Sequence, residues 1–299
     1  MPPPVRLYGQ NVFPSKVTIA SLSLLLAEVG PCWLCAAASA VKLGLGRARA
    51  PNQLSVVERA GMARILFSWE MGEGMGHLVP LRPVLEALVA DGHDLVVAAV
   101  DIRSARAALG HLTDKIVQSP KVVDRGFPLG RPAEGSADLL DLNGYCDDAS
   151  LRGRHPAWRQ IAALWKPDLV IAEHSPGALL MSRALDIPAI HAGTGFTLPP
   201  HTSPILFPGF SPGENPDREA LLINRMNGLL REDGGRPLNQ LSDLFNDVAD
   251  RFLLTFRELD QLGPRDDVPY LGVQVPDQGE APIWPEGSSR LFAYLKPFP

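Results

Sequence analysis

Residues 63–77, ARILFSWEMGEGMGH, run from an apolar segment through alternating glycines to a histidine. Only glycine adopts positive φ without a steric penalty, so three residues let the chain turn sharply and leave room for a ligand: Gly72, Gly74 and Gly76. Residues 81–92, LRPVLEALVADG, then place apolar side chains three and four positions apart, which predicts a helix. The pattern is that of a strand, a tight turn and a helix at the mouth of an α/β sheet.

His77 is the titratable side chain that this turn delivers. Pro80 suits a first helical turn, so we predict that His77 lies just ahead of a helix N-terminus. The partial positive charge at such an end disfavours imidazolium and favours a neutral ring that accepts a proton. This context predicts a general base, the alternative being a histidine that caps or packs the turn.

Composition excludes several classes of protein. The chain has 299 residues, of which 45% are hydrophobic, and its net charge of −5 provides no basic surface for a nucleic acid. Three cysteines are too few and too unevenly spaced for a disulfide framework, so we expect a reducing, cytoplasmic location. Cys32 and Cys35 form a CxxC pair, but it lies in an Ala/Leu-rich leader rather than after a strand, so we expect no redox or metal site there.

Residues 1–61 are predicted to be a poorly ordered N-terminal extension, because Met62 directly precedes the first strand. Their apolar stretch is interrupted by Glu28 and Pro31, and a central charge costs roughly 2.5–3.5 kcal/mol in a membrane span. We therefore expect no membrane span. A signal peptide is the alternative, since basic residues precede an apolar run that ends in small side chains at 38–40.

From residue 62 onward, strand and helix signals alternate, which predicts a parallel sheet covered by helices. Residues 119–154 lose periodicity and are predicted to be a long loop. The remaining predictions are strands at 93–101, 115–118, 168–173, 188–192, 252–256 and 270–273, and helices at 104–110, 177–185, 218–231 and 238–251, with one more helix after residue 154 that ends near Trp165.

Two segments, GMGHLVP and KPDLVIAEHSPGALLMSRALDIPAIHAGTGF, resemble the N-terminal half of family 1 glycosyltransferases of the GT-B architecture, in particular bacterial enzymes that modify natural products. The resemblance implies a Rossmann-like, doubly wound parallel sheet over residues 62–275 that binds the acceptor. Residues 276–299 would then be the interdomain linker and the first strand of a donor-binding domain that is otherwise missing, so that the C-terminal domain is truncated.

The resemblance also implies an activity. Enzymes of this family transfer a sugar from a nucleotide-sugar donor, a co-substrate, to an acceptor hydroxyl with inversion and without an obligatory metal or other cofactor. The histidine of the Gly-His turn is their base, which places that role on His77. The orienting acid matches Glu173, where the family commonly has aspartate. Without a donor domain we expect negligible activity of the chain alone, and a separately encoded donor domain is one candidate partner.

The carboxyl ends of parallel strands meet at one edge of a sheet, so Glu173 and His77 are expected to lie together. A solvated acid at the strand end is the alternative for Glu173. The small-molecule acceptor is expected to contact residues of the same edge, namely Gly74, Gly76, His174, His191, Thr194 and Phe196.

Two rival functions remain open at this stage. An NAD(P)-dependent oxidoreductase would use the glycine turn and Asp101, but its fingerprint requires a glycine where His77 stands. A non-catalytic binding protein that retains only the acceptor pocket is the second rival. Binding of an acceptor without transfer would distinguish it from an enzyme.

Overall fold

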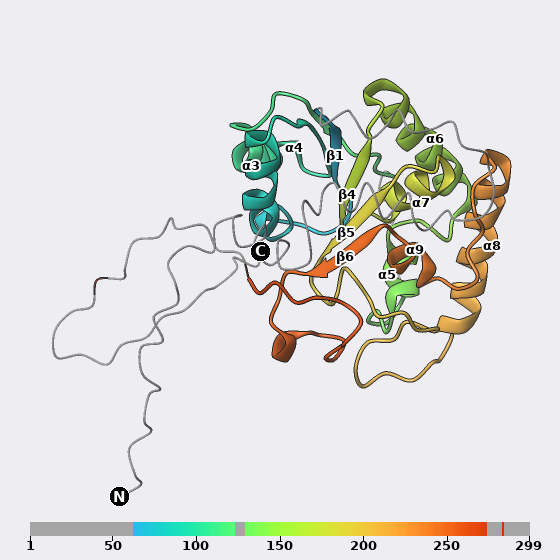
Figure 1. Cartoon of the computed structure of the whole chain (residues 1–299). Coiled ribbons are helices and arrows are strands. Elements are labelled where there is room, and N and C mark those ends of the chain that lie inside the picture. Colours follow the sequence, from blue (N-terminus) through green and yellow to red (C-terminus); the bar gives the residue numbers. More distant parts are fainter. Residues whose placement is uncertain (1–61, 123–128, 274–282, 284–299) are drawn as a thin grey trace, which may run out of the picture.

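Six parallel strands form one sheet in the computed structural model, which describes residues 62–122, 129–273 and 283 (Figure 1). The strand order is β3-β2-β1-β4-β5-β6. The chain therefore builds outward from β1 to β3 and then crosses back to β4, which makes the sheet doubly wound and Rossmann-like, as predicted. The bounds are β1 Arg64–Trp69, β2 Asp94–Ala99, β3 Ile116–Gln118, β4 Leu169–Glu173, β5 Ala189–Gly193 and β6 Asp250–Leu253.

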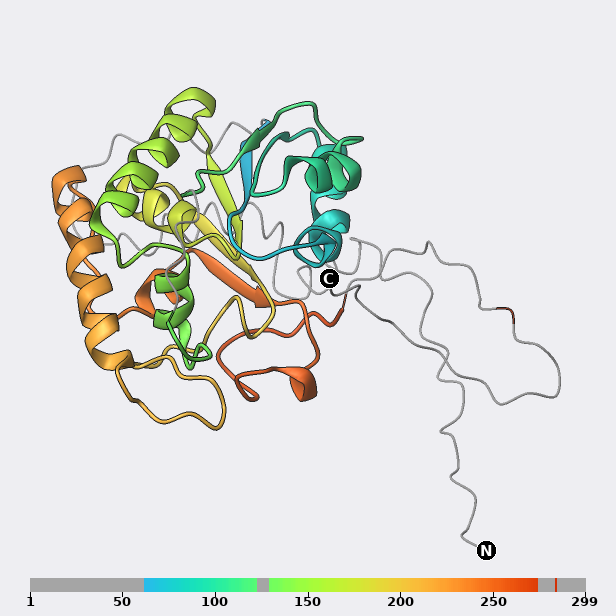
Figure 2. The ribbon, with the colours of Figure 1, turned by 180° about the vertical axis from the view of Figure 1, so that it is seen from behind.

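Helices cover both faces of this sheet. Helices α3 and α4 lie on one side and α6, α7 and α8 on the other, as both views of the ribbon show (Figures 1 and 2). The bounds are α3 Arg82–Ala90, α4 Ile102–Leu109, α5 Ser136–Leu142, α6 Asp148–Trp165, α7 Pro176–Ala184, α8 Asn215–Asp233 and α9 Asp243–Asn246, with short 3-10 turns at η1 Met75–His77, η2 Val79–Leu81 and η3 Arg257–Leu259.

The core follows from the alternation of side chains along the strands. In β1, Phe67 and Trp69 are fully buried among the residues of α3 and α4, whereas Leu66 packs into the cluster on the opposite face. Both faces of the sheet are thus dry, which explains why its central strands read as nearly continuous apolar runs. No helix in the described part of the chain is long and apolar enough to span a membrane.

The predicted loop at residues 119–154 is wrong over its second half. The structure places α5 there, and α6 begins at Asp148 after Asp147, whose carboxylate accepts a hydrogen bond from the Ser150 amide. Gly153 and Pro156 lie inside α6 and obscure its periodicity in the sequence, although Trp158 and other apolar side chains of α6 are buried. Tertiary packing overrides their low helix propensity.

The predicted helix at residues 238–251 is also largely wrong. Only α9 is helical, because the chain leaves it to pair with β5. The Ala249 amide donates to the Ala189 carbonyl at 2.8 Å, and β6 continues that pairing. The strand predicted at 270–273 makes a single bridge, between Tyr270 and Leu253. The segments expected as an extension, 1–61, and as a linker, 276–299, lie outside the described residues apart from Ile283.

Candidate active site

The glycine turn joins β1 to α3 by a less direct route than the sequence indicated. His77 is the last residue of η1, and η2 separates it from α3, which begins at Arg82. Pro80 lies in η2 rather than in the first turn of α3. His77 therefore lies just ahead of a short 3-10 helix, as expected of a helix N-terminus, but five residues before the start of α3.

A hydrogen bond connects His77 to Glu173, with His77 Nδ1 lying 2.7 Å from Glu173 Oε2. The register explains the contact: Trp69, the last residue of β1, pairs with Glu173, the last residue of β4. Burial raises the pKa of the Glu173 carboxyl, and hydrogen bonds from His77 and Thr197 oppose that rise. When Glu173 is ionised it accepts a hydrogen bond from Nδ1–H, which leaves the lone pair of the neutral ring on Nε2.

His174 directly follows the last residue of β4, and its ring lies beside that of His77. Its backbone has φ of +44° and its carbonyl accepts a hydrogen bond from the Met71 amide at 3.0 Å. The His174 ring stacks on His77 with centroids 5.5 Å apart and meets Phe196 edge-on at 5.9 Å. Burial lowers the pKa of His174 to about 3, so this imidazole is neutral at physiological pH.

Five rings form a continuous row along this edge of the sheet. Trp69 also stacks on His77 at 5.4 Å, and Phe196 stacks on Phe207 at 5.3 Å. The structure thus brings the predicted residues His174 and Phe196 close to His77. We did not predict Trp69, although it could have been found from the sequence, because it ends the strand that pairs with the strand of Glu173.

The four other predicted acceptor residues are not members of this row of rings. His191 is fully buried, its Nδ1–H donates to the Phe245 carbonyl at 3.0 Å, and burial lowers its pKa to about 4. Thr194 shapes the turn after β5, its amide donating to Thr197 Oγ1 at 3.0 Å. Gly74 and Gly76 are exposed, and a Cβ atom at either would meet nothing within 4 Å. His191 is therefore a core histidine that a ligand cannot touch.

Glu70, a buried acid, directly follows Trp69 and binds residues on the other face of the sheet. Its carboxylate accepts hydrogen bonds from the Tyr145 hydroxyl and the Gly177 amide, each at 2.7 Å, and lies 3.3 Å from the Arg154 guanidinium. Burial raises the pKa of Glu70, and the charge of Arg154 opposes the rise. The Tyr145 ring is consequently part of the core, unavailable to stack on a ligand.

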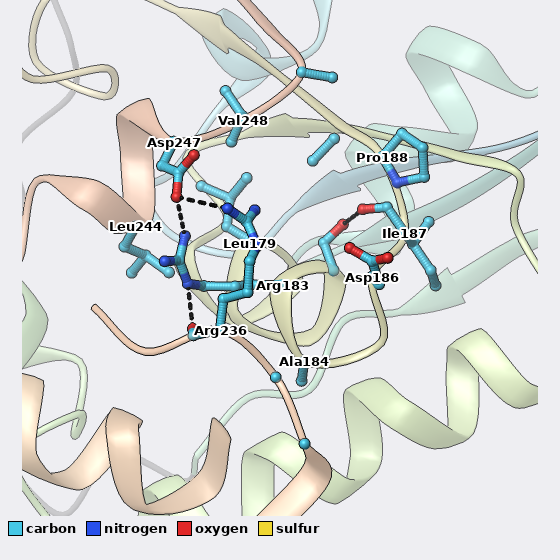
Figure 3. A pocket seen from close by; sticks show the side chains of 15 residues that line it. Leu179, Arg183, Ala184, Asp186, Ile187, Pro188, Arg236, Leu244, Asp247 and Val248 are labelled. Carbon is cyan, nitrogen blue, oxygen red and sulfur yellow. Dashed lines mark hydrogen bonds and ion pairs between the residues drawn. The ribbon is translucent and has the colours of Figure 1, made fainter. Parts of the chain in front are cut away.

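Two cavities lie at opposite ends of the sheet. One of about 230 Å³ borders the glycine turn and is lined by Glu70, Gly72 and Glu73 among others. A larger one of about 480 Å³ opens at the amino edge, beside the start of β5 (Figure 3). There Arg183 and Arg236 both bind the Asp247 carboxylate, and Asp186 is the second acid of the lining, so the charges of the two arginines are balanced. The larger cavity is remote from His77.

The structure gives Asp101, the acidic residue that an NAD(P)-dependent oxidoreductase would need, a structural role. Asp101 is the N-cap of α4, and its carboxylate accepts hydrogen bonds from the amides of Arg103 and Ser104 at 2.9 and 3.3 Å. An oxygen used in this way is a structural group rather than a free ribose ligand. No group of three His, Cys, Asp or Glu residues able to hold a metal occurs in residues 62–122 and 129–273, and the Cys32–Cys35 pair lies outside them.

Comparison with known proteins supports the resemblance. No family model matches the chain. L-Demethylnoviosyl transferase of Streptomyces niveus is 37% identical over 106 residues, which are 33% of this chain and 26% of that protein. The chain resembles glycosyltransferases. It spans about a quarter of the length of this curated relative.

Solved structures similar to this glycosyltransferase-like chain carry the same description. The glycosyltransferase SnogD from Streptomyces nogalater is 18% identical with a TM-score of 0.45, over 76% of this chain and 55% of that one. The calicheamicin glycosyltransferase CalG4 is 15% identical with a TM-score of 0.49, over 75% and 56%. SsfS6 from Streptomyces sp. SF2575 is 22% identical with a TM-score of 0.38, over 59% and 47%.

Proposed function

We propose that this chain is the acceptor-binding half of an inverting family 1 GT-B glycosyltransferase, with His77 as the general base and Glu173 as the acid that orients it. The observation that carries the proposal is the 2.7 Å contact between His77 Nδ1 and Glu173 Oε2 at the carboxyl edge of the sheet. The similarity to a curated sugar transferase supports the same reaction class.

In this reaction a hydroxyl oxygen of a small-molecule acceptor attacks the anomeric carbon of a nucleotide sugar. The bond from that carbon to the diphosphate breaks on the opposite face, so the configuration inverts, and the hydroxyl proton passes to His77 Nε2. A base within about 3 Å of the hydroxyl contributes roughly 10²- to 10⁴-fold to such a rate. Glu173 fixes the tautomer and stabilises the imidazolium that forms, as the aspartate does in a Ser-His-Asp site.

The test is sugar transfer by the chain joined to the donor-binding domain of a glycosyltransferase, assayed with nucleotide sugars and a panel of hydroxyl acceptors. We expect His77→Ala to lower the transfer rate at least 100-fold, in line with the usual contribution of a general base, while the affinity for the acceptor stays nearly unchanged. Glu173→Gln should slow transfer less severely, because the amide still positions the ring.

His111→Ala is the matched control, since His111 is exposed and lies at another site, where it pairs with Glu86. An unchanged rate for His77→Ala eliminates His77 as the base. Acceptor binding by calorimetry without any transfer, even with a donor domain supplied, identifies the chain as a non-catalytic binding protein.

A further inference from the structure

The ring of His77 is held by its neighbours but keeps 18% of its side-chain surface exposed. Trp69 and His174 both stack on it, with centroids 5.4 and 5.5 Å away, and Glu173 holds Nδ1. The space beside Nε2 is open because residue 72 is a glycine without a Cβ atom. We propose that Gly72 and Trp69 are positioning residues for His77, Gly72 by leaving the space that Nε2 occupies and Trp69 by fixing the plane of the ring.

Gly72 is the glycine of the turn that the His77 ring requires. A Cβ atom at position 72 would lie 2.3 Å from His77 Nε2 and 2.8 Å from Cε1, whereas ordinary contact begins at 3.4 Å. The ring would have to move by roughly 1 Å to restore ordinary contact, which changes its distances to both stacking partners and to Glu173. The sequence analysis named all three glycines of the turn but placed only Gly74 and Gly76 among the acceptor residues, and these two have open space around them.

Trp69 holds the turn as well as the ring. The fully buried indole donates its Nε1–H to the Met71 carbonyl at 2.7 Å, and the Met71 amide donates to the His174 carbonyl at 3.0 Å. The two residues that stack on His77 are therefore tied to each other through the main chain of Met71. We call Trp69, Met71, Gly72 and His174 the histidine clamp.

The histidine clamp adds positioning residues to the proposed site, and its effect on the transfer rate rests on the proposed function. A base acts only within hydrogen-bond reach of its proton, and a misplacement of about 1 Å can cost roughly 100-fold in rate. The structure of the clamp itself, however, can be tested without any catalytic assay. A negative NMR result counts against the clamp, whereas a negative transfer assay counts against the proposed function, so the two failures can be told apart.

The experiment uses the chain as it is, with ¹³C-labelled histidine, and follows the Hε1 and Hδ2 signals of His77 by NMR. Aromatic rings stacked on an imidazole shift these protons upfield. We expect Gly72→Ala to move both signals downfield, toward those of the exposed His111. Gly74→Ala is a closely matched control, because φ is +83° at Gly74 and +87° at Gly72, so both alanines bear similar backbone strain and only one meets the ring.

Trp69→Phe keeps an aromatic face and loses the indole N–H, so an intermediate shift is expected, smaller than that of Gly72→Ala. Far-ultraviolet circular dichroism verifies that each variant is folded before its spectrum is compared. The proposal is overturned if the His77 signals of Gly72→Ala coincide with those of the parent chain, or if Gly74→Ala moves them as far. In a transferase assay, Gly72→Ala should lower kcat about 100-fold with the KM for acceptor little changed.

Discussion

Burial keeps both histidines near the proposed base uncharged. The pKa of His174 falls to about 3 and that of His191 to about 4, because each imidazole is removed from water. A neutral His174 stacked on His77 does not repel the positive charge that would form on His77 during transfer. The two histidines thus differ in role: His174, just after β4, stacks on the proposed base, and His191, within β5, fills the core.

The depressed pKa of His191 predicts acid sensitivity of folding. In the unfolded chain a histidine takes up its proton near pH 6.5, but His191 in the folded chain does so only near pH 4. Stability is therefore full above pH 6.5 and is lost as the pH falls toward 4, by about 2 kcal/mol at pH 5.

His191→Leu should remove this part of the acid dependence, at a cost of about 1 kcal/mol at pH 7.5 because the Phe245 carbonyl loses its donor. Urea unfolding at several pH values measures both effects. His111→Leu is the control for losing an exposed histidine. An acid slope in His191→Leu as steep as in the parent chain contradicts the prediction.

The contact between His77 and Glu173 could be predicted from the sequence because parallel strands bring their carboxyl ends to one edge. The histidine clamp could not be predicted in the same way. Which of three exposed glycines lies against a ring depends on the path of η1, which a glycine-rich sequence does not specify. The place of Trp69 beside Glu173 follows from the strand pairing, but the stacking of its indole on His77 depends on the path of the turn.

At the scale of single elements, capping by side chains decides where helices begin. Asp101 and Asp147 each accept hydrogen bonds from amides of the first turn, of α4 and α6 respectively. Such caps satisfy amides that have no partner within the helix. The start of α4 was predicted to within two residues, whereas Asp147 was missed because glycine and proline follow it within α6.

Replacing the cap of α4 should destabilise the whole domain. We expect Asp101→Ala to lower the free energy of unfolding by about 1 kcal/mol, and Asp101→Asn to retain most of it, because asparagine also caps well. Thermal and urea unfolding measure the change. Asp91→Ala is the comparison, since Asp91 is exposed at the C-terminal end of α3, where a carboxylate gains nothing from the helix dipole. Equal losses at both positions contradict the capping role.

The long, strongly periodic elements were predictable and the short or interrupted ones were not. Strands β1, β2, β4 and β5 and helices α3, α4, α7 and α8 lie where apolar periodicity placed them. In contrast, the end of α9 and the start of β6 depend on the pairing of Ala249 with Ala189, a contact 60 positions distant in sequence. Local propensity carries no information on such a partner.

For the molecule as a whole, the Glu70–Arg154 pair ties the edge of the sheet to its helical layer. Both side chains are almost fully buried, and Arg154 also donates to the Asn143 carbonyl at 2.6 Å and lies over the Tyr145 ring. One pair thus links the end of β1 with α5 and α6. Removing one partner of such a pair leaves a buried charge uncompensated.

We expect Arg154→Leu to lower the free energy of unfolding by about 3 kcal/mol at pH 7. The loss should narrow as the pH falls, since burial raises the pKa of Glu70 and the protonated acid needs no counter-charge. Arg152→Leu is the matched control: it lies in the same helix and pairs with Asp148 and Glu232, but is half exposed, so a change under about 1 kcal/mol is expected. Similar losses for both variants, measured by urea unfolding, contradict the prediction.

Met71 ties the glycine-rich turn to the residues around His77. The segment that follows Met71 is exposed and rich in glycine, yet both main-chain groups of Met71 are bound, the carbonyl to the indole of Trp69 and the amide to the carbonyl of His174. A movement of the turn at Met71 would break a bond to one of the two residues that stack on His77. Movement of the glycine turn is therefore coupled to the orientation of the His77 ring.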